Sequence, residues 1–229
     1  MSTRPNYFIG VQISFSSPVQ QAGLNSLYEE LKSRNRNIGR ILSSPTKLHI
    51  TLALLNIEES RVLEAAKCFQ ASADGMRSLL RDNHTLSFRK VNAFGQKNDR
   101  NSLWLESQSS QTFDALMNYC VYISEFFAAN NFESRPSNVL HATIAKKYSR
   151  NMKITERDYL DLDTFVAALS PVVCTEIDLL KIGSTDPTNG YYQSYSKLYI
   201  DDSSISSSDA KVDLETAGPV RDEREDTKA

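Results

Sequence analysis

The sequence predicts an α+β fold made of two similar halves, and three observations support this. Short segments rich in aromatic and β-branched residues alternate with amphipathic segments of helical period over residues 1–201. The order of these segments nearly repeats halfway along the chain. The phrase LHITLALL at 48–55 also returns, 92 residues later, as LHATIAKK at 140–147. We therefore expect one bilobal, duplicated domain at 1–201, with two antiparallel sheets, a central cleft and outer helices.

The first half begins with a strand at Tyr7–Phe15, where YFIGVQISF is rich in aromatic and β-branched residues. Ser17 and Pro18 then open a helix whose apolar residues recur at helical spacing. After the loop NRNIGR, the phrase KLHITLALL is predicted to form a second strand. One long amphipathic helix is expected at Glu58–Leu80.

The second half begins with two short strands, TLSFRKVNAF and SLWLES, separated by the polar turn GQKNDRN. The segment QTFDALMNYCVYISEFFAANN has the period of a helix, and the strand LHATIAKK follows it. A helix near ERDYLDLDTFVAAL precedes a closing pair of strands, VVCTEIDLLKIG and YYQSYSKLYI. The turn STDPTNG joins that pair, because Asp-Pro and Asn-Gly supply turn chemistry.

The composition excludes several functional classes. The 229 residues carry a formal net charge of −2, and the tail at 202–229 holds eight acidic and four basic residues. The other 22 basic and 20 acidic residues give +2, so we expect no strong binding of duplex nucleic acid. The tail is poor in large apolar residues and is predicted to be a disordered acidic segment. Because no run of about 18 apolar residues occurs, we expect no membrane partner.

The three cysteines indicate a reducing compartment. Cys68, Cys120 and Cys174 are odd in number, far apart and set among apolar neighbours. This pattern favours reduced thiols over a disulfide framework or a zinc site. The N-terminal segment has no cationic stretch followed by a long apolar one. We expect a cytoplasmic or nuclear monomer without a metal or another cofactor.

Two of the three histidines lie in the repeated phrase, and each is followed two residues later by threonine. Because side chains alternate along a strand, His49 and Thr51 share one face, and His141 and Thr143 share one face of the second strand. Two such His-x-Thr motifs among three histidines would arise by chance roughly once in a hundred cases, which favours a functional role. His84 is interpreted as a surface turn residue.

Two imidazoles and two hydroxyls that face each other suit transfer at a phosphodiester. One imidazole takes a proton from the attacking hydroxyl or water, and the other delivers a proton to the leaving oxygen. Histidine fits both roles because its unperturbed pKa is about 6.5. The threonine hydroxyls donate hydrogen bonds to the non-bridging oxygens. This chemistry demands no metal, and the sequence leaves open which histidine is the acid and which the base.

Candidate substrate-binding residues lie around the motifs. If the strands are regular, Lys47 and Lys147 lie on the histidine face and Lys146 on the other. Cations there would favour a phosphate-bearing ligand, although lysines at strand ends also serve to protect sheet edges. Arg135, just before the second phrase, is a candidate phosphate clamp.

Aromatic residues could stack on a base of the substrate. Tyr191 and Tyr192 are expected to point opposite ways on the last strand, so at most one faces the cleft, and Tyr192 is our candidate. Phe15, Phe94 and Trp104 are further candidates, with ordinary packing as the alternative for each.

The doubled motif resembles the signature of the 2H phosphoesterase superfamily. KLHITLALL, LHATIAKK and the late NGYYQSYSKLYI are similar to one branch of it. That branch includes the A-kinase-anchoring-protein nuclear-signal domain and the phosphoesterase-like domain of the activating signal cointegrator subunit. The similarity extends from Tyr7 to about Asp201.

The resemblance implies a bilobal fold with a central cleft, no metal, and action on RNA-like phosphodiesters. Substrates in the superfamily include 2′,3′-cyclic phosphates, 2′,5′-linked oligoadenylates and the 3′ ends of small RNAs. The histidines of the family fall on His49 and His141, and its hydroxyl positions on Thr51 and Thr143, so all four are intact.

We see no amphipathic helix after the domain, so we do not expect kinase anchoring. We see no RNA-binding domain before Tyr7, so the cointegrator architecture is expected to be incomplete. Our first hypothesis is a metal-independent phosphodiesterase for 2′,5′-oligoadenylate or a related short RNA. The second is a non-catalytic module that binds AMP or CMP or serves as a scaffold. The third is a 3′-end RNA exonuclease or a cyclic phosphodiesterase.

Overall fold

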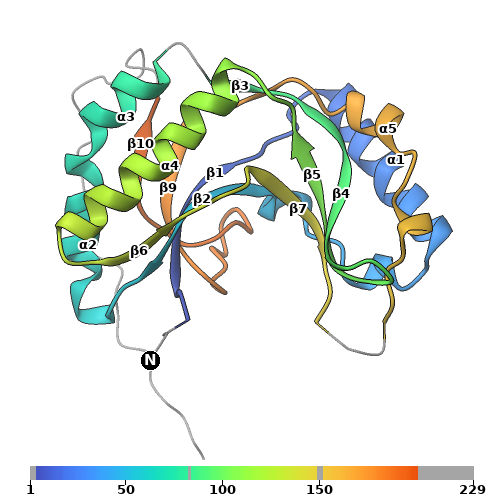
Figure 1. The fold of residues 1–229 in the computed structure, drawn as a ribbon, viewed down its shortest axis with the longest axis horizontal. Helices are drawn as coiled ribbons and strands as arrows, with labels where there is room; N and C mark the ends of the chain where they lie inside the picture. The colour runs from blue at the N-terminus through green and yellow to red at the C-terminus, as the bar shows by residue number, and fades with distance from the viewer. Residues whose placement is uncertain (1–3, 82–83, 149–151, 201–229) are drawn as a thin grey trace, which may run out of the picture.

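The computed structural model describes residues 4–81, 84–148 and 152–200, and most of its strands form one long curved sheet (Figure 1). These strands are β1 (Tyr7–Gln12), β2 (His49–Asn56), β4 (Phe88–Gln96), β5 (Asp99–Ser107), β6 (Glu133–Pro136), β7 (His141–Lys146), β9 (Glu176–Lys181) and β10 (Ser194–Tyr199). Their order is β10-β9-β1-β2-β7-β5-β4, with β6 paired to β2 as well. A second sheet joins β3 (Thr85–Leu86) to β8 (Val172–Val173).

The structure confirms the α+β class with antiparallel strands but corrects the division into two sheets. β2 and β7 pair at one position, Ile50 with Ala142, and this pair links the strands of both halves into one sheet. Further along β2, residues Ala53–Asn56 pair with β6 instead of β7. β2 and β7 therefore pair at a single position and diverge beyond it.

Helices cover the outer side of the curved sheet in two groups (Figure 1). One group lies over β9, β10 and β6, and the other lies near β4 and β5 at the opposite end. The first group is α2 (Val62–Ala71), α3 (Ala73–Leu80) and α4 (Gln111–Ala129), and the second is α1 (Pro18–Arg34) and α5 (Asp163–Ala167). Short 3₁₀ segments lie at Ile38–Arg40, Pro45–Lys47, Glu59–Arg61 and Glu156–Asp158.

Local side-chain chemistry fixes where the long helices begin. The Ser17 hydroxyl accepts a hydrogen bond from the Gln20 backbone at 3.1 Å, and the Gln20 side chain accepts one from the Ser17 backbone at 3.3 Å. This capping box satisfies two donors at the start of α1. Ser110 caps α4 in a similar way, by accepting from the backbone of Phe113 at 3.1 Å.

Two expected helices are shorter than the sequence suggested. The helix predicted at Glu58–Leu80 is divided at Ser72, whose buried hydroxyl donates to the Phe69 backbone oxygen at 2.6 Å. A serine hydroxyl that takes a backbone acceptor competes with the helical hydrogen bonds, so α2 ends and α3 begins there. The segment ERDYLDLDTFVAAL forms a 3₁₀ turn and the five-residue α5.

The core lies between the sheet and the helices. The non-histidine faces of the two repeated phrases are part of it, since Ile50, Leu52, Ala142 and Ile144 are all fully buried. The three cysteines are buried with free thiols, as the sequence predicted. Burial on this scale fixes the strand register, because a one-residue slip would move these side chains to the other face.

Three expectations concern features other than the sheet. No helix in the described ranges has the length and apolarity that a membrane crossing needs. Within the same ranges, no group of three or more His, Cys, Asp or Glu side chains could hold a metal ion. The acidic tail at 202–229 lies outside the described residues.

Candidate active site

The two His-x-Thr motifs meet at the point where the two halves of the sheet meet. Ile50 and Ala142, the central residues of the motifs, are the one antiparallel pair between β2 and β7. Continued by one residue on either side, this register sets His49 across from Thr143 and Thr51 across from His141. Because Ile50 and Ala142 face the core, all four motif side chains lie on the opposite face, called the histidine face below.

Each histidine is oriented by the backbone of its own strand. Nδ1 of His49 donates to the backbone oxygen of Lys47 at 2.8 Å, and Nδ1 of His141 donates to that of Val139 at 2.8 Å. In both histidines the bond goes to the residue two positions earlier, and it fixes the tautomer that carries its proton on Nδ1. Nε2 is thereby left as the nitrogen that can accept or deliver a proton at a substrate.

Aromatic rings flank both imidazoles. The His49 ring lies 4.8 Å from Phe8 and 5.2 Å from Tyr192, between ring centroids. The His141 ring lies 5.1 Å from Phe94 and 5.3 Å from Trp104. Each imidazole therefore has an apolar wall on its side of the point where the motifs meet.

Burial lowers the pKa of both histidines. His49 is the more enclosed of the two, and the charges of His141 and Lys146 lower its pKa further, while the bond to the Lys47 carbonyl opposes the shift. Burial also lowers the pKa of His141, and the bond to the Val139 carbonyl opposes it. Both side chains are therefore mostly neutral at pH 7.

A β-bulge follows the threonine in both motifs. Gly10 pairs with Thr51 but Ile9 pairs with Ala53, so β2 holds one extra residue at Leu52. Trp104 pairs with Thr143 but Leu103 pairs with Ala145, so β7 holds its extra residue at Ile144. A bulge of this kind shifts the alternation of side chains by one position. The matched bulges extend the likeness of the two strands beyond the motif.

The bulge corrects the prediction for the lysines after His141. Lys146 pairs with Ser102, which pairs in turn with Phe94, and Phe94 contacts His141. Lys146 therefore lies on the histidine face, and its charge acts on His49. Lys147 instead forms an ion pair with Asp99, and its side chain is 8% exposed. The expected places of Lys146 and Lys147 are exchanged.

Lys47 is engaged with the loop that follows β9. It lies in a 3₁₀ turn just before β2, and its ammonium donates to the Ser184 backbone oxygen at 3.1 Å and to the Thr185 hydroxyl at 2.6 Å. The ammonium also lies 4.9 Å from the centre of the Tyr192 ring. Lys47 thus holds this loop and Tyr192 close to His49.

Arg135 lies on β6, farther from the motifs. The Ser134 hydroxyl donates to Ser124 on α4 at 3.0 Å, so Ser134 faces the helices and Arg135 faces the other way. Arg135 pairs with Leu54, two residues after the bulged Leu52 of β2. These two residues line a surface hollow with Pro5, Leu55, Asn56 and Glu133.

The expectation that Tyr191 and Tyr192 point opposite ways is wrong, because β10 begins only at Ser194. The backbone N–H of Asp186 donates to the backbone oxygen of Tyr191 at 2.8 Å, so Tyr191 is part of the turn before β10. Both tyrosines belong to a small apolar cluster with Phe8 and Leu180 on the histidine face. Of the other aromatic candidates, Phe94 and Trp104 contact His141, whereas Phe15 packs in the main core.

Sequence reasoning missed Phe8 and Lys146. Phe8 alternates with Tyr7 and Ile9, which are in the main core, and its pairing with Leu54 on β2 agrees with a place on the histidine face. Lys146 is placed by a bulge. A comparison of the two phrases gives one usable signal, since an alanine follows the bulged residue in both, at Ala53 and Ala145.

This geometry agrees with the comparison to known proteins. The family model described as the AKAP7 2′5′ RNA ligase-like domain matches residues 5–200. The chain belongs to this family. It is a 2H phosphoesterase, as its motifs indicated.

Individual relatives of this 2H phosphoesterase are more distant. An RNA 2′,3′-cyclic phosphodiesterase from Bacillus subtilis (strain 168) is 27% identical over 146 residues, which are 64% of this chain and 73% of that protein. The crystal structure of TT0787 of Thermus thermophilus has a TM-score of 0.52 and 13% identity, and covers 85% of this chain and 97% of its own. Escherichia coli LigT complexed with NADP+ has a TM-score of 0.50 and 14% identity, and covers 87% and 99%. At these identities the two structures support the fold alone.

Proposed function

We propose that this protein is a metal-independent phosphodiesterase for short RNA-like substrates, with 2′,5′-linked oligoadenylates as its first candidates. The observation that carries the proposal is the pair of His-x-Thr motifs joined at Ile50 and Ala142. Two imidazoles of one tautomer lie on one face, so one can deprotonate the nucleophile while the other protonates the leaving oxygen. Thr51 and Thr143 donate to the non-bridging oxygens.

Lys146 is the cation best placed to meet the phosphate. It shares the histidine face, whereas Lys147 is paired with Asp99 and Lys47 with the loop before β10. An ammonium beside the scissile phosphate stabilises the negative charge that builds up on it in the transition state. We therefore assign to Lys146 the role that the sequence suggested for Lys147.

Two aromatic walls favour a substrate with a base on each side of the scissile phosphate. Tyr192 and Phe8 flank one histidine, and Phe94, stacked on Trp104 at 4.9 Å, flanks the other. Stacking of a base on an aromatic ring contributes about 1–3 kcal/mol and tolerates any base. A dinucleotide unit can use both walls, whereas a cyclic mononucleotide uses one. Arg135 and the hollow beside Leu54 would then receive the next nucleotide.

Hydrolysis of 2′,3′-cyclic phosphates is the second candidate, because the Bacillus subtilis relative is named for that activity. It uses the same four motif residues, with water as the nucleophile. The two candidates differ in what the aromatic walls contribute. Replacing Phe94 with alanine should weaken the cleavage of a dinucleotide more than that of a cyclic mononucleotide.

One assay tests the proposal and ranks the candidates. The purified protein is incubated with 2′,5′- and 3′,5′-linked diadenylates and with 2′,3′-cyclic AMP, with and without EDTA, and the products are identified by mass. We expect the 2′,5′-linked substrate to be cleaved fastest, at a rate that EDTA leaves unchanged. Loss of activity in EDTA would refute the metal-independent mechanism, and binding of AMP without turnover of any substrate would identify a non-catalytic module.

A further inference from the structure

A buried carboxyl lies on the histidine face, one strand beyond the active site. Asp178 of β9 pairs with Gly10 of β1, and Gly10 pairs with Thr51. Cross-strand partners share a face, so Asp178 lies on the histidine face about 10 Å from Thr51, two strand spacings away. The proton transfers described above do not use it.

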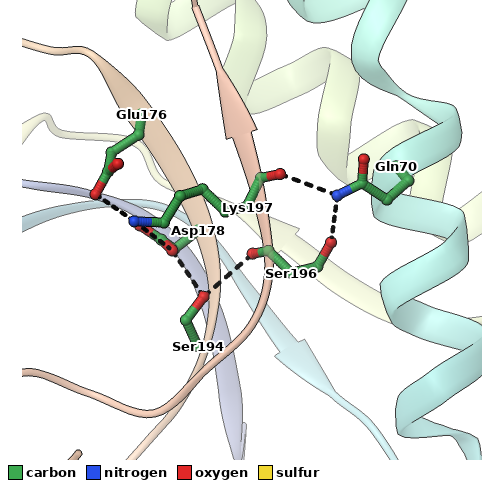
Figure 2. Close-up of polar contacts among 6 residues, drawn as sticks. All are labelled: Gln70, Glu176, Asp178, Ser194, Ser196 and Lys197. Carbon is green, nitrogen blue, oxygen red and sulfur yellow. Dashed lines mark hydrogen bonds and ion pairs between the residues drawn. The ribbon is translucent and has the colours of Figure 1, made fainter. Parts of the chain in front are cut away.

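The hydrogen bonds of Asp178 satisfy only half of its carboxyl group. The side chain is 2% exposed, and Oδ1 accepts from the Ser194 hydroxyl at 2.7 Å (Figure 2). The Lys197 ammonium lies 3.9 Å from Oδ1 but makes its short contact, 2.6 Å, with Glu176. Oδ2 is buried without a hydrogen-bond partner among the described residues, and so is the hydroxyl of Tyr191.

Tyr191 connects Asp178 to the active site. It packs with Leu180, the next residue of β9 on the same face, and burial raises the pKa of its hydroxyl, to which the charge of Asp178 adds. The following residue is Tyr192, whose ring contacts both Phe8 and His49. A displacement of Tyr191 would therefore move part of the wall beside His49.

The strands around Asp178 are fixed, whereas the segment over it is a loop. Gln70 of α2 donates to the Ser196 hydroxyl at 2.7 Å and to the Lys197 backbone oxygen at 2.9 Å, which ties β10 to the helix layer (Figure 2). β9 is paired on both sides, with β1 and β10. Tyr191 and Tyr192 lie outside the sheet, in a loop held by the Asp186 bond to the Tyr191 backbone oxygen and by the Lys47 bonds. A shift of these two residues would break no strand pairing.

We propose that Asp178 is a positioning residue whose protonation decides how firmly the Tyr191–Tyr192 segment is seated beside His49. Neither Oδ2 nor the Tyr191 hydroxyl has a hydrogen-bond partner in the structure, so the bond that the neutral carboxyl would donate to Tyr191 is part of the proposal. Ser194 would still donate to Oδ1. The ionised carboxylate needs solvation that its buried position withholds. Loosening the segment above it lets water in and moves Tyr192 away from His49.

This change falls within the range in which enzymes are assayed. Burial raises the pKa of the Asp178 carboxyl to about 6, the charge of Glu176 raises it too, and the Ser194 bond and Lys197 oppose the shift. A solvated carboxyl has a pKa of about 3.9. The seated arrangement is therefore most stable at low pH and loses stability as the pH rises from about 4 to 6. Above that range, the full free energy of burying the ionised carboxylate opposes it. The other titratable groups near Asp178 come from three elements: Glu176 on β9, Lys197 and Tyr199 on β10, and Tyr191 and Tyr192 in the loop. The residue of β1 that pairs with Asp178 is Gly10, which has no side chain.

The first test compares the wild type with Asp178→Asn, which is uncharged and can donate to Tyr191 at any pH. Binding of a 2′,5′-diadenylate with a methylated attacking hydroxyl is measured from pH 5 to 8, since its diester charge is constant over that range. We expect the wild-type Kd to rise relative to the variant's, reaching about threefold by pH 8 as the seated fraction falls. The value of kcat should stay within about twofold. Both proteins contain the same histidines, so the effect of histidine titration cancels in the ratio of the wild-type Kd to the variant Kd.

The second test uses the two neighbouring charges. Glu176→Gln removes a charge that raises the pKa of Asp178, and Lys197→Gln removes one that lowers it. The midpoint of the binding change should therefore move to lower pH in the first variant and to higher pH in the second. A purely structural role would weaken binding in both without moving the midpoint, and that result would overturn the proposal.

The inference builds on the proposed function, and a third measurement separates the two. In the free protein, ¹³C-labelled carboxyl and tyrosine rings report Asp178 and Tyr192 by NMR without any substrate. We expect the Tyr192 ring signals to follow the titration of Asp178 and to be independent of pH in Asp178→Asn. A Tyr192 ring that stays unchanged while Asp178 titrates would refute the positioning role, whereas failure to bind the diadenylate would refute the proposed function instead.

Discussion

The two halves of the active site have the same local geometry but are assembled over different distances along the chain. His141 is flanked by Phe94 and Trp104, which both come from the hairpin of β4 and β5. His49 is flanked by Phe8 from β1 and by Tyr192 from the loop near the end of the domain. The aromatic residues of the His141 half are thus close to each other in sequence. Those of the His49 half come from opposite ends of the domain.

The two halves also differ in the side chains that lie beside each threonine on the neighbouring strands. Beside Thr143 lies the indole of Trp104, followed by Asn92. Beside Thr51 lies Gly10, which has no side chain, followed by the buried Asp178. Two residues after the bulged residue lies Lys146 in one half and Leu54 in the other. The two halves are alike at their histidines and threonines, and they differ in the side chains that surround them.

The largest effect should be the loss of either imidazole, since the proposed chemistry needs both. His49→Ala and His141→Ala should each lower kcat by about 10²–10⁴-fold, because general acid and general base contribute on that scale. Steady-state rates on the 2′,5′-diadenylate measure this, and circular dichroism checks the fold. His84→Ala is the matched control and should retain activity. A loss confined to one of the two variants would contradict the equal roles of the halves.

The next effect separates the two lysines that the bulge exchanges. Lys146→Met should lower kcat/KM by about tenfold to a hundredfold, the worth of a charged hydrogen bond. Lys147→Met should leave kcat/KM unchanged and cost about 1 kcal/mol in the free energy of unfolding, because it breaks an ion pair with the half-exposed Asp99. Kinetics and urea unfolding of both variants measure the two effects. The opposite result, with Lys147 essential for activity, would support the regular-strand prediction.

The lysine exchange shows where sequence reasoning reaches its limit at this site. Alternation along the strands predicted that His49, Thr51, His141 and Thr143 share one face, since each motif is shorter than the regular run of its strand. It failed at Lys146 because a bulge adds a residue and reverses every later position. Bulges depend on the pairing of neighbouring strands, which a single sequence does not display.

The fold shows the same division between local and long-range information. The helix start at Ser17 and the strand at β2 follow from capping chemistry and period, and both were predicted. The break at Ser72 depends on a buried hydrogen bond, and β6 is a four-residue strand that includes a proline. The single sheet depends on one pair, Ile50 with Ala142, between strands far apart in sequence.

A smaller effect should come from Gly10, the residue that allows the Phe8 ring to lie beside His49. A Cβ at Gly10 would stand 3.0 Å from the Ile50 backbone oxygen and 3.0 Å from the Phe8 ring, both too close. Gly10→Ala should therefore displace Phe8, cost about 1–3 kcal/mol in stability and lower kcat/KM several-fold. Gly39→Ala is the control, since its Cβ would meet the flexible Lys32 side chain at 3.2 Å. Equal kinetics for both variants would show that Phe8 does not support His49.

The smallest effect is a shift in pH dependence, and it can show which histidine has the lower pKa. Because the pKa of both imidazoles is lowered, the bell-shaped profile of kcat/KM should have its maximum below about pH 6.5. Lys146 lowers the pKa of His49 but is not among the causes that act on His141. In Lys146→Met the limb that belongs to His49 should therefore move to higher pH, while the other limb stays in place. Movement of the acidic limb would show that His49 has the lower pKa of the two imidazoles, and movement of the alkaline limb would show that it has the higher one. A maximum above pH 7.5 in the wild type would show that the two imidazoles are not the titrating groups.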